Sequence, residues 1–231
     1  MSRKPPTEAA HTTRHAEIRR SARDQFNKWA LSYDRSRLNE LVFFPTVRTC
    51  QEEIYRWLEP RADRPFRMLD VGCGTGTLVN LVAHLPQAEQ VVGLDYSPVM
   101  IRHLWEKIED SPHREKLHGV VADSEQLPFA DASFDVLTCC NSFHHYPHQA
   151  ECIRGFRRVL RPGGLLILVD GFRDNVVGWV IFDVVVATVE RNVHHASWSE
   201  FRHMIHAAGF ASLRQRKTNV LAPLLLNVAA C

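Results

Sequence analysis

The chain has 231 residues, of which 45% are hydrophobic and 23% are charged, a composition that is ordinary for a globular domain. Its formal net charge of +2 at pH 7 gives no indication of a broad nucleic-acid-binding surface. The six cysteines form no C-x-x-C pair and no Cys/His spacing typical of a metal site. We therefore expect a soluble cytoplasmic protein without a bound metal.

The N-terminal part is expected to lie outside the main fold. Residues 1–20 are polar, contain two prolines and lack the apolar core of a signal peptide, so we expect a disordered tail. Residues 21–60 are expected to form a helical cap or lid, with a helix from Leu38 to Leu58 that is interrupted near Pro45. Residues 61–231 then form the core.

The most informative segment runs from Met68 to Gly76. An apolar strand ends at Asp70 and is followed by glycines at every second position, and Thr77–Leu85 reads as a helix. Free N–H groups at the start of that helix face the loop, so the segment is half of a nucleotide-binding βαβ unit. A dinucleotide fingerprint would need a third glycine where Thr77 stands, and no Gly-Lys-Ser/Thr follows. Asp70 would repel a pyrophosphate but suits a ligand with an ammonium group.

Further strands follow in order. Val91–Asp95 is a short buried strand that ends in an acid, about twenty residues after the glycines, where a carboxylate can accept both ribose hydroxyls. Val120–Asp123 and Phe134–Cys140 are the next two strands. A helix then stops at a Pro-Gly-Gly run before the strand Leu165–Asp170.

The pattern Asp70-x-Gly-x-Gly-x-Gly resembles the first motif of class I S-adenosylmethionine-dependent methyltransferases. With the four later segments in order, the resemblance extends from Met68 to Asp170 and is greatest to the branch that includes ubiquinone, menaquinone and small-molecule methyltransferases. It implies S-adenosylmethionine as cofactor and S-adenosylhomocysteine as product. The glycine loop would wrap the methionine end, and the acid at Asp123 would accept from the adenine amino group. The expected cofactor-binding residues are Tyr33, Asp70, Gly72, Cys73, Gly74, Gly76, Asp95, Tyr96, Asp123, Ser124 and Asn141.

Two regions are expected on the acceptor side. The segment Phe26–Asp34 resembles the lid that precedes the core in this branch, with Tyr33 against the cofactor. In this fold the loop after the fourth strand faces the transferred methyl group. His145, and next His144, are therefore the candidate catalytic residues, as a general base for a hydroxyl acceptor or as walls of the pocket. An amine or thiolate acceptor would need no base.

The resemblance implies a Rossmann-like, doubly wound α/β sheet of seven strands, with the last strand antiparallel and a helical N-terminal cap. The last two strands are expected near Phe210–Arg216 and Val220–Ala229, and an inserted helix near 176–191, over the active site or at a homodimer contact. That apolar insert is too short to cross a bilayer.

The expected function is methyl transfer to a small or lipid-like organic acceptor. Two alternatives stay open: an RNA or tRNA methyltransferase, which the near-neutral charge disfavours, and a non-catalytic partner protein that binds S-adenosylmethionine. The intact acids Asp70, Asp95 and Asp123 argue against the second.

Overall fold

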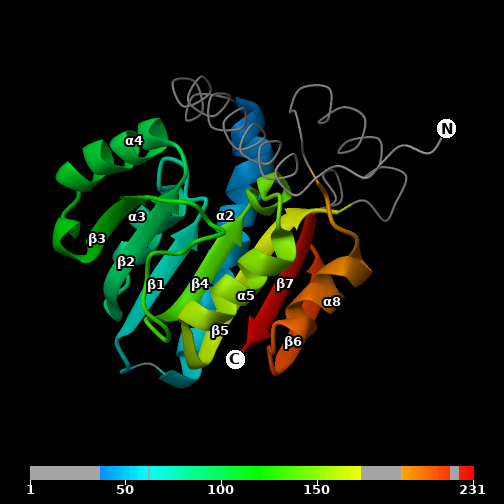
Figure 1. Ribbon diagram of the computed structural model, residues 1–231. Coiled ribbons are helices and arrows are strands. Elements are labelled where there is room, and N and C mark those ends of the chain that lie inside the picture. The colour runs from blue at the N-terminus through cyan, green and yellow to red at the C-terminus, as the bar shows by residue number, and fades with distance from the viewer. Residues whose placement is uncertain (1–36, 62, 173–193, 219–223) are drawn as a thin grey trace.

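A computed structural model describes residues 37–61, 63–172, 194–218 and 224–231. Its seven-stranded sheet has the order β3-β2-β1-β4-β5-β7-β6 (Figure 1). The first five strands, β1 (Phe66–Val71), β2 (Ala88–Asp95), β3 (Leu117–Val121), β4 (Phe134–Cys140) and β5 (Leu160–Gly171), are parallel. β7 (Leu224–Ala230) lies antiparallel to β5 and to β6 (Ser212–Lys217). The predicted α/β fold is confirmed, but the Pro-Gly-Gly run expected to precede the fifth strand lies inside β5, which begins at Leu160.

Helices cover both faces of this sheet. In Figure 1, α2 (Arg37–Leu58) lies behind the sheet, and α5 (Gln149–Val159) and α8 (Trp198–Ala207) lie in front. The helices α3 (Thr77–Ala83) and α4 (Pro98–Glu109) connect the first strands. Three short 3-10 turns complete the described helical elements: η1 (Glu59–Arg61), η2 (Arg114–Lys116) and η3 (Phe143–His145).

The prediction of an interrupted helix near Pro45 is wrong. The helix α2 is continuous from Arg37 to Leu58 with Pro45 inside it, and the Thr49 hydroxyl donates to the Pro45 carbonyl at 2.8 Å. Its later turns are anchored, because Cys50 and Ile54, one helical turn apart, are fully buried against the sheet. This burial offsets the hydrogen bond that the proline ring removes.

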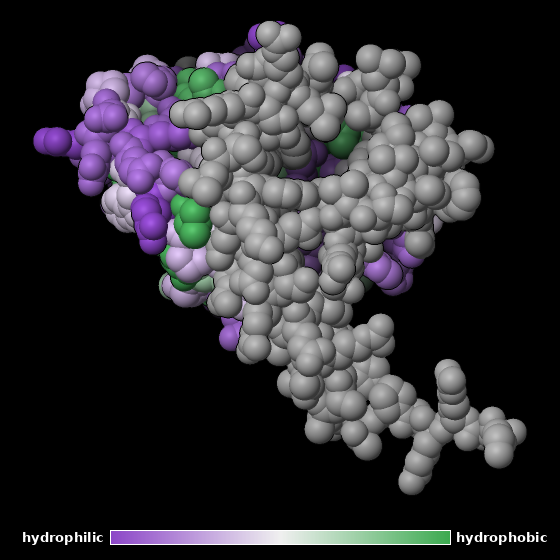
Figure 2. All heavy atoms as spheres, turned by 90° about the horizontal axis from the view of Figure 1, so that it is seen from above, coloured by the Kyte–Doolittle hydropathy of each residue, from purple (hydrophilic) through white to green (hydrophobic). Residues whose placement is uncertain are grey.

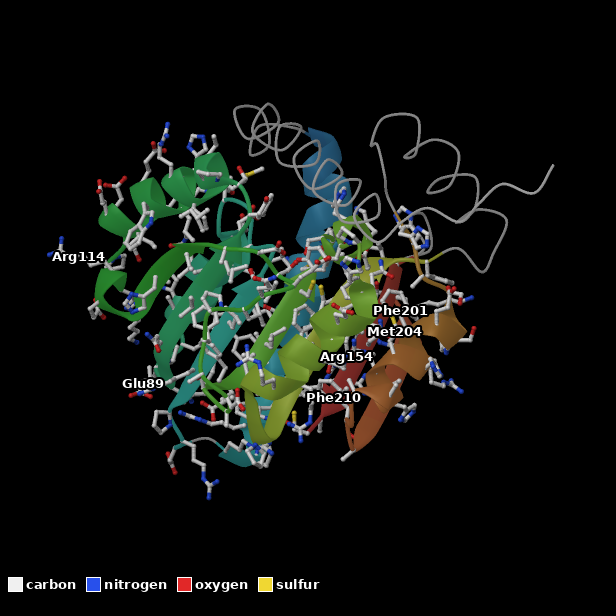
Figure 3. All side chains as sticks on the ribbon, in the orientation of Figure 1. Glu89, Arg114, Arg154, Phe201, Met204 and Phe210 are labelled. Carbon is white, nitrogen blue, oxygen red and sulfur yellow. The ribbon has the colours of Figure 1, made fainter. Side chains whose placement is uncertain are left out.

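The core consists of two apolar layers, one on each face of the sheet. Neighbouring strand residues supply opposite layers: Met68 packs with α2, α3 and α4, whereas Leu69 packs with α5 and α8. Figure 3 labels Phe201 and Met204 on α8, and Phe201 packs in the second layer with Phe156 of α5. Both faces of the strands are therefore buried, as expected for parallel strands.

The outer face of the molecule near α4 is polar. Ser97 caps α4 by accepting from the Met100 N–H at 3.2 Å, and Met100, Ile101, Leu104 and Ile108 form its buried side. Seen from above, the described surface on that side is mainly hydrophilic, with isolated hydrophobic spheres (Figure 2). None of the helices that the structure describes would reach across a bilayer as an apolar span.

Several predicted segments lie outside the described residues. These are the tail of residues 1–20, the first part of the lid with Tyr33, and the inserted helix near 176–191. The domain boundaries stay a prediction.

The start of α8 gives a test of local stability. Ser197 accepts from the Glu200 N–H at 3.1 Å and the Glu200 carboxylate accepts from the Ser197 N–H, so both halves of a capping box are present. We expect Ser197→Ala to lower the free energy of unfolding by about 1 kcal/mol, measured by chemical denaturation. Ser212→Ala, at an exposed position where β6 begins, should change it by less than about 0.5 kcal/mol.

Candidate active site

The predicted site residues lie where parallel strands end. Asp70 belongs to the end of β1, Asp95 ends β2 and Asp123 follows β3, while Asn141 follows β4. Since β1 lies between β2 and β4, the carboxyl ends of these strands meet at one edge of the sheet. Ligands of open α/β sheets bind at this edge.

The three loop glycines have left-handed backbones for different reasons. All have positive φ, from 53° at Gly74 to 78° at Gly76. A Cβ on Gly72 would collide with the Ser142 side chain, and a Cβ on Gly76 would collide with Leu104. A Cβ on Gly74 would meet no described atom within 4 Å. Packing therefore explains Gly72 and Gly76, and only Gly74 faces space that a ligand could fill.

The Asp95 carboxylate binds the backbone of the glycine loop and of the turn before α4. One carboxylate oxygen accepts from the Gly74 N–H at 2.9 Å and the other from the Ser97 N–H at 2.8 Å. Burial raises the pKa of Asp95, and these backbone N–H groups oppose the increase. These contacts fix the carboxylate in place, and because a carboxylate has about four lone-pair sites it can still accept from a ligand hydroxyl.

Asp70 is a buried carboxyl, 3% exposed, beside this loop. Burial raises its pKa to about 7; a hydrogen bond from the Thr138 hydroxyl at 2.6 Å opposes the shift, and the charge of Asp95 adds to it. A buried carboxyl with a raised pKa is stabilised in its charged form by a cationic ligand. This is the environment that a ligand with an ammonium group would require.

The remaining cofactor candidates differ in orientation. Cys73 is partly buried against the apolar layer, and its thiol donates to the Gly74 carbonyl at 3.5 Å. Tyr96 is 39% exposed next to Asp95. Asp123 accepts from the Glu125 N–H at 3.0 Å, and Ser124 is 8% exposed beside it. Tyr96 follows β2, and Asp123 and Ser124 follow β3.

Asn141 joins the loop after β4 to the N-terminal helix. It has a left-handed backbone with φ of 53°, which asparagine tolerates better than most residues. Its amide donates to the Thr46 hydroxyl of α2 at 2.7 Å, and its N–H donates to the Val169 carbonyl of β5 at 2.8 Å. Asn141 thus lies at the same strand edge as the acids.

The histidines after β4 form a cluster that the sequence predicted only in part. Nδ1 of His144 lies 2.6 Å from the Asp170 carboxylate, and its ring stacks on His195 with centroids 4.7 Å apart. The ring of His145 lies 4.1 Å from that of His144. Burial lowers the pKa of His145 well below its usual value, and His144 and His195 add to this effect, so His145 is neutral at physiological pH.

Asp170 is the functional candidate that the sequence reasoning missed, and His195 is one that it ranked below His144 and His145. Asp170 has the same signal as Asp95, an acid at the end of a buried strand. His195 has no comparable signal, because it comes from a distant segment. Together with His144 they place one possible ligand atom each within 4.8 Å of one another. The cysteine and histidine spacing did not predict this group.

An open cavity of about 370 Å³ lies beside His194, the residue that precedes His195. His194 connects this cavity to the histidine cluster, since its N–H donates to the His144 carbonyl at 2.7 Å and its carbonyl accepts from Gln149 at 2.7 Å. The exposed lining is mostly apolar, as is typical of small-molecule sites. The residues lining it are Gln149, His194, Ala196, Ser199, Glu200, His203 and Met204.

The residues present fit S-adenosylmethionine on the cofactor side. No atom of the described residues lies within 4 Å of a Cβ placed on Gly74, Asp95 offers a fixed carboxylate for a ribose diol, and Asp70 is a buried acid suited to an ammonium group. Asp123 and Asn141 lie at neighbouring strand ends. Tyr33 lies outside the described residues.

Sequence comparison points in the same direction. Residues 69–168 match the family model of a methyltransferase domain. A demethylmenaquinone methyltransferase of Listeria welshimeri is 32% identical over 157 residues, covering 67% of this chain and 64% of that protein. One of Desulfitobacterium hafniense is 28% identical over 169 residues, covering 71% of this chain and 65% of that protein. The chain thus spans slightly less than two thirds of the curated relatives that it matches.

Structural comparison shows the fold. A Haloferax volcanii chain solved in complex with the Trm112 methyltransferase activator has a TM-score of 0.73 at 19% identity, covering 91% of this chain and 97% of that chain. The [4+2]-cyclase SpnF has a TM-score of 0.61 at 19% identity, covering 84% of this chain and 79% of that chain. A likeness that includes a cyclase cannot by itself identify the reaction.

Proposed function

Because this chain belongs to the class I S-adenosylmethionine-dependent methyltransferases, in the branch of quinone and small-molecule enzymes, we propose that it transfers a methyl group to a small or lipid-like organic acceptor. The family assignment confirms the predicted cofactor, S-adenosylmethionine. The observation that carries the proposal is the glycine loop, in which a Cβ on Gly74 would meet no described atom and the Gly74 N–H is held by Asp95.

Each cofactor residue has a role that its surroundings support. Asp95 accepts the ribose hydroxyls, Asp123 accepts the adenine amino group, and Asp70 faces the ammonium group. Gly74 gives close approach to the backbone, and Asn141 lies on the methionine side. S-adenosylmethionine supplies an activated methyl group on a sulfonium, so these residues mainly have to align the reactants and exclude water.

The acceptor is proposed to bind at the histidine cluster and the neighbouring cavity. The name of the Listeria relative, demethylmenaquinone methyltransferase, favours a quinone-like acceptor. The cavity beside His194 is mostly apolar, which suits an aromatic or lipid-like molecule. His144 and His145 are the proposed catalytic residues on this side.

Calorimetry with S-adenosylhomocysteine tests the cofactor half of the proposal, with NADH as the ligand that should not bind. The transfer half is tested by incubating the protein with labelled S-adenosylmethionine and a reduced naphthohydroquinone, with bulk tRNA as a counter-screen. Methyl transfer to tRNA alone would favour the nucleic-acid alternative. Cofactor binding without transfer to any acceptor would favour the non-catalytic alternative.

Asp70→Asn should have opposite effects on cofactor binding and on the stability of the free protein. Loss of one charge-assisted contact, about 1.5–3 kcal/mol, weakens S-adenosylhomocysteine binding by about 10–150-fold. The folded-state pKa of Asp70, about 7, is above the ordinary 3.8. The contribution of Asp70 to the free energy of unfolding is therefore fully present below about pH 4 and is lost as the pH rises through about 7. Asparagine has no such loss, so the ligand-free variant should be more stable than wild type above about pH 7.

The same linkage gives wild-type binding a pH dependence. An ammonium group favours the ionised Asp70, so binding releases a proton and the affinity increases as the pH rises through about 7. Calorimetry in two buffers of different ionisation enthalpy measures this proton release. Thr138→Val removes the hydrogen bond that opposes the raised pKa, so it should move the midpoint to higher pH. Proton release that persists unchanged in Asp70→Asn would assign the effect to another group.

A further inference from the structure

Asp170 is held by the backbone of two separate elements. The carboxylate is 1% exposed and accepts three hydrogen bonds: from the Gly171 N–H at 2.7 Å, from the His144 N–H at 2.9 Å, and from His144 Nδ1 at 2.6 Å. Burial raises the pKa of Asp170, but the charge and hydrogen bond of His144 outweigh burial, and the pKa stays below its usual value. Asp170 is therefore a carboxylate at neutral pH.

This arrangement determines the tautomer of His144. A carboxylate can only accept hydrogen bonds, so Nδ1 of His144 must carry the hydrogen. In the neutral ring, Nε2 then has the lone pair. A histidine whose Nδ1–H is held by a buried carboxylate is oriented to take a proton at Nε2.

The ring of His144 is also fixed by its neighbours. His195, 3% exposed, stacks on it with an interplanar angle of 21°, and His145 lies on the same turn η3. Among the residues that the structure describes, the titratable groups whose contacts with the His144 ring are recorded are Asp170, His145 and His195. Of these, Asp170 carries a negative charge and stabilises a proton on His144, whereas His145, whose pKa is lowered, stays neutral.

We propose that His144 is the general base that deprotonates the methyl acceptor, with Asp170 and His195 as its positioning residues, and that the acceptor therefore carries an ionisable hydroxyl, as in a phenol or hydroquinone. This inference rests on the proposed function and selects His144 rather than His145. The acceptor O–H bond breaks, its proton moves to Nε2 of His144, and the electron pair stays on the acceptor oxygen. The positive imidazolium is stabilised by Asp170 and later returns the proton to water.

A divalent cation is the competing explanation of the same three residues, whose ligand atoms lie within 4.8 Å of one another. The hydrogen bonds favour the base. Asp170 already accepts the ring N–H of His144, and a cation bound between the two would have to replace that hydrogen. Metal binding is therefore an outcome that would overturn the proposal.

The decisive variant is Asp170→Asn, which keeps the shape but can donate to Nδ1 of His144 and so favour the wrong tautomer. With a naphthohydroquinone acceptor, we expect turnover to fall by about 10²–10⁴-fold and the dependence on histidine ionisation to disappear. The affinity for S-adenosylhomocysteine should change by less than about twofold. Nitrogen-15 NMR of the imidazoles in the full-length protein should show hydrogen on Nδ1 of His144 in wild type and its loss from Nδ1 in the variant.

The chain offers a matched control. His148 contacts Glu125 in the same two-point manner, with its N–H at 3.0 Å and Nδ1 at 2.9 Å from the two oxygens. Glu125→Gln disturbs this histidine–carboxylate pair and should leave both turnover with naphthohydroquinone and its pH profile unchanged. His195→Phe retains a stacked ring and should retain the tautomer of His144.

The outcomes distinguish a failure of the proposed function from a failure of His144 as the base. Failure of wild type to bind S-adenosylhomocysteine would contradict the proposed function itself. If wild type binds the cofactor normally but His144 carries its hydrogen on Nε2 and none on Nδ1, the proposed function stands and the assignment of His144 as the base is wrong. Full turnover of Asp170→Asn would also contradict the assignment of His144 as the base. Stoichiometric binding of Co²⁺, with a visible absorption band that Asp170→Asn abolishes, would assign the three residues to a metal site instead.

Discussion

Asp95→Ala is expected to weaken the binding of S-adenosylhomocysteine by more than about a hundredfold. The variant loses two charge-assisted hydrogen bonds to the ribose diol, each about 1.5–3 kcal/mol. It also releases the Gly74 N–H, which the Asp95 carboxylate accepts at 2.9 Å, so the loop loses its support. Both effects act in the same direction. Isothermal titration calorimetry on folded protein measures the change.

Asp135→Ala is a suitable control. Asp135 is also a strand carboxylate that accepts a backbone N–H, from Arg67 at 2.8 Å, but it lies at the opposite ends of the strands, where β4 begins. Its loss should lower stability and leave cofactor affinity unchanged. An equal loss of affinity in both variants would mean that Asp95 acts through general stability, and an unchanged affinity in Asp95→Ala would remove it from the site.

Gly74→Val should reduce cofactor binding below detection while the fold is retained. An added Cβ at Gly74 meets no described atom within 4 Å, so the branched side chain has room in the free protein. It then fills the space that the ligand needs. The left-handed backbone adds strain of about 1–3 kcal/mol, which the free protein must tolerate.

Gly163→Val is the control that separates the effect of backbone strain from the effect of a side chain that obstructs the ligand. Gly163 also has a positive φ, 75°, and no described atom within 4 Å of its Cβ position, but it lies near the start of β5, away from the loop. Both variants should show similar circular dichroism and a similar decrease in melting temperature. Only Gly74→Val should lose the ligand. Normal binding by a folded Gly74→Val protein would show that the loop is not the cofactor site.

Local patterns predicted the positions of those parts of the candidate site that lie within single segments. The glycine run after a buried strand located the loop, and the acid that ends Val91–Asp95 was located by its place in the strand. Topology then followed, because the segments occur in the order typical of the family. The sequence could not distinguish the glycines, since the neighbours that require Gly72 and Gly76, Ser142 and Leu104, come from distant positions.

The histidine cluster was predicted only in part for the same reason. His144 was recognised by its loop, but its partner Asp170 lies 26 residues away and His195 comes from a third segment. The pairing depends on β4 and β5 lying side by side. Pro45 shows the opposite error, because a strong local signal for a helix break is overridden by the burial of the following turns of α2.

The position of β7 has a consequence for how the chain folds. β5 is complete at Gly171, yet its outer edge pairs with β7, which is the last described strand in the chain. β6 comes before β7 in the chain, and β7 is its neighbour in the sheet. A chain synthesised only as far as β6 therefore has an apolar strand with an open edge and a sixth strand with no template to join. Long-range pairing of this kind is slow, and an open edge can pair with other molecules. Truncation within the last described strand would thus lead to aggregation rather than to a smaller folded domain.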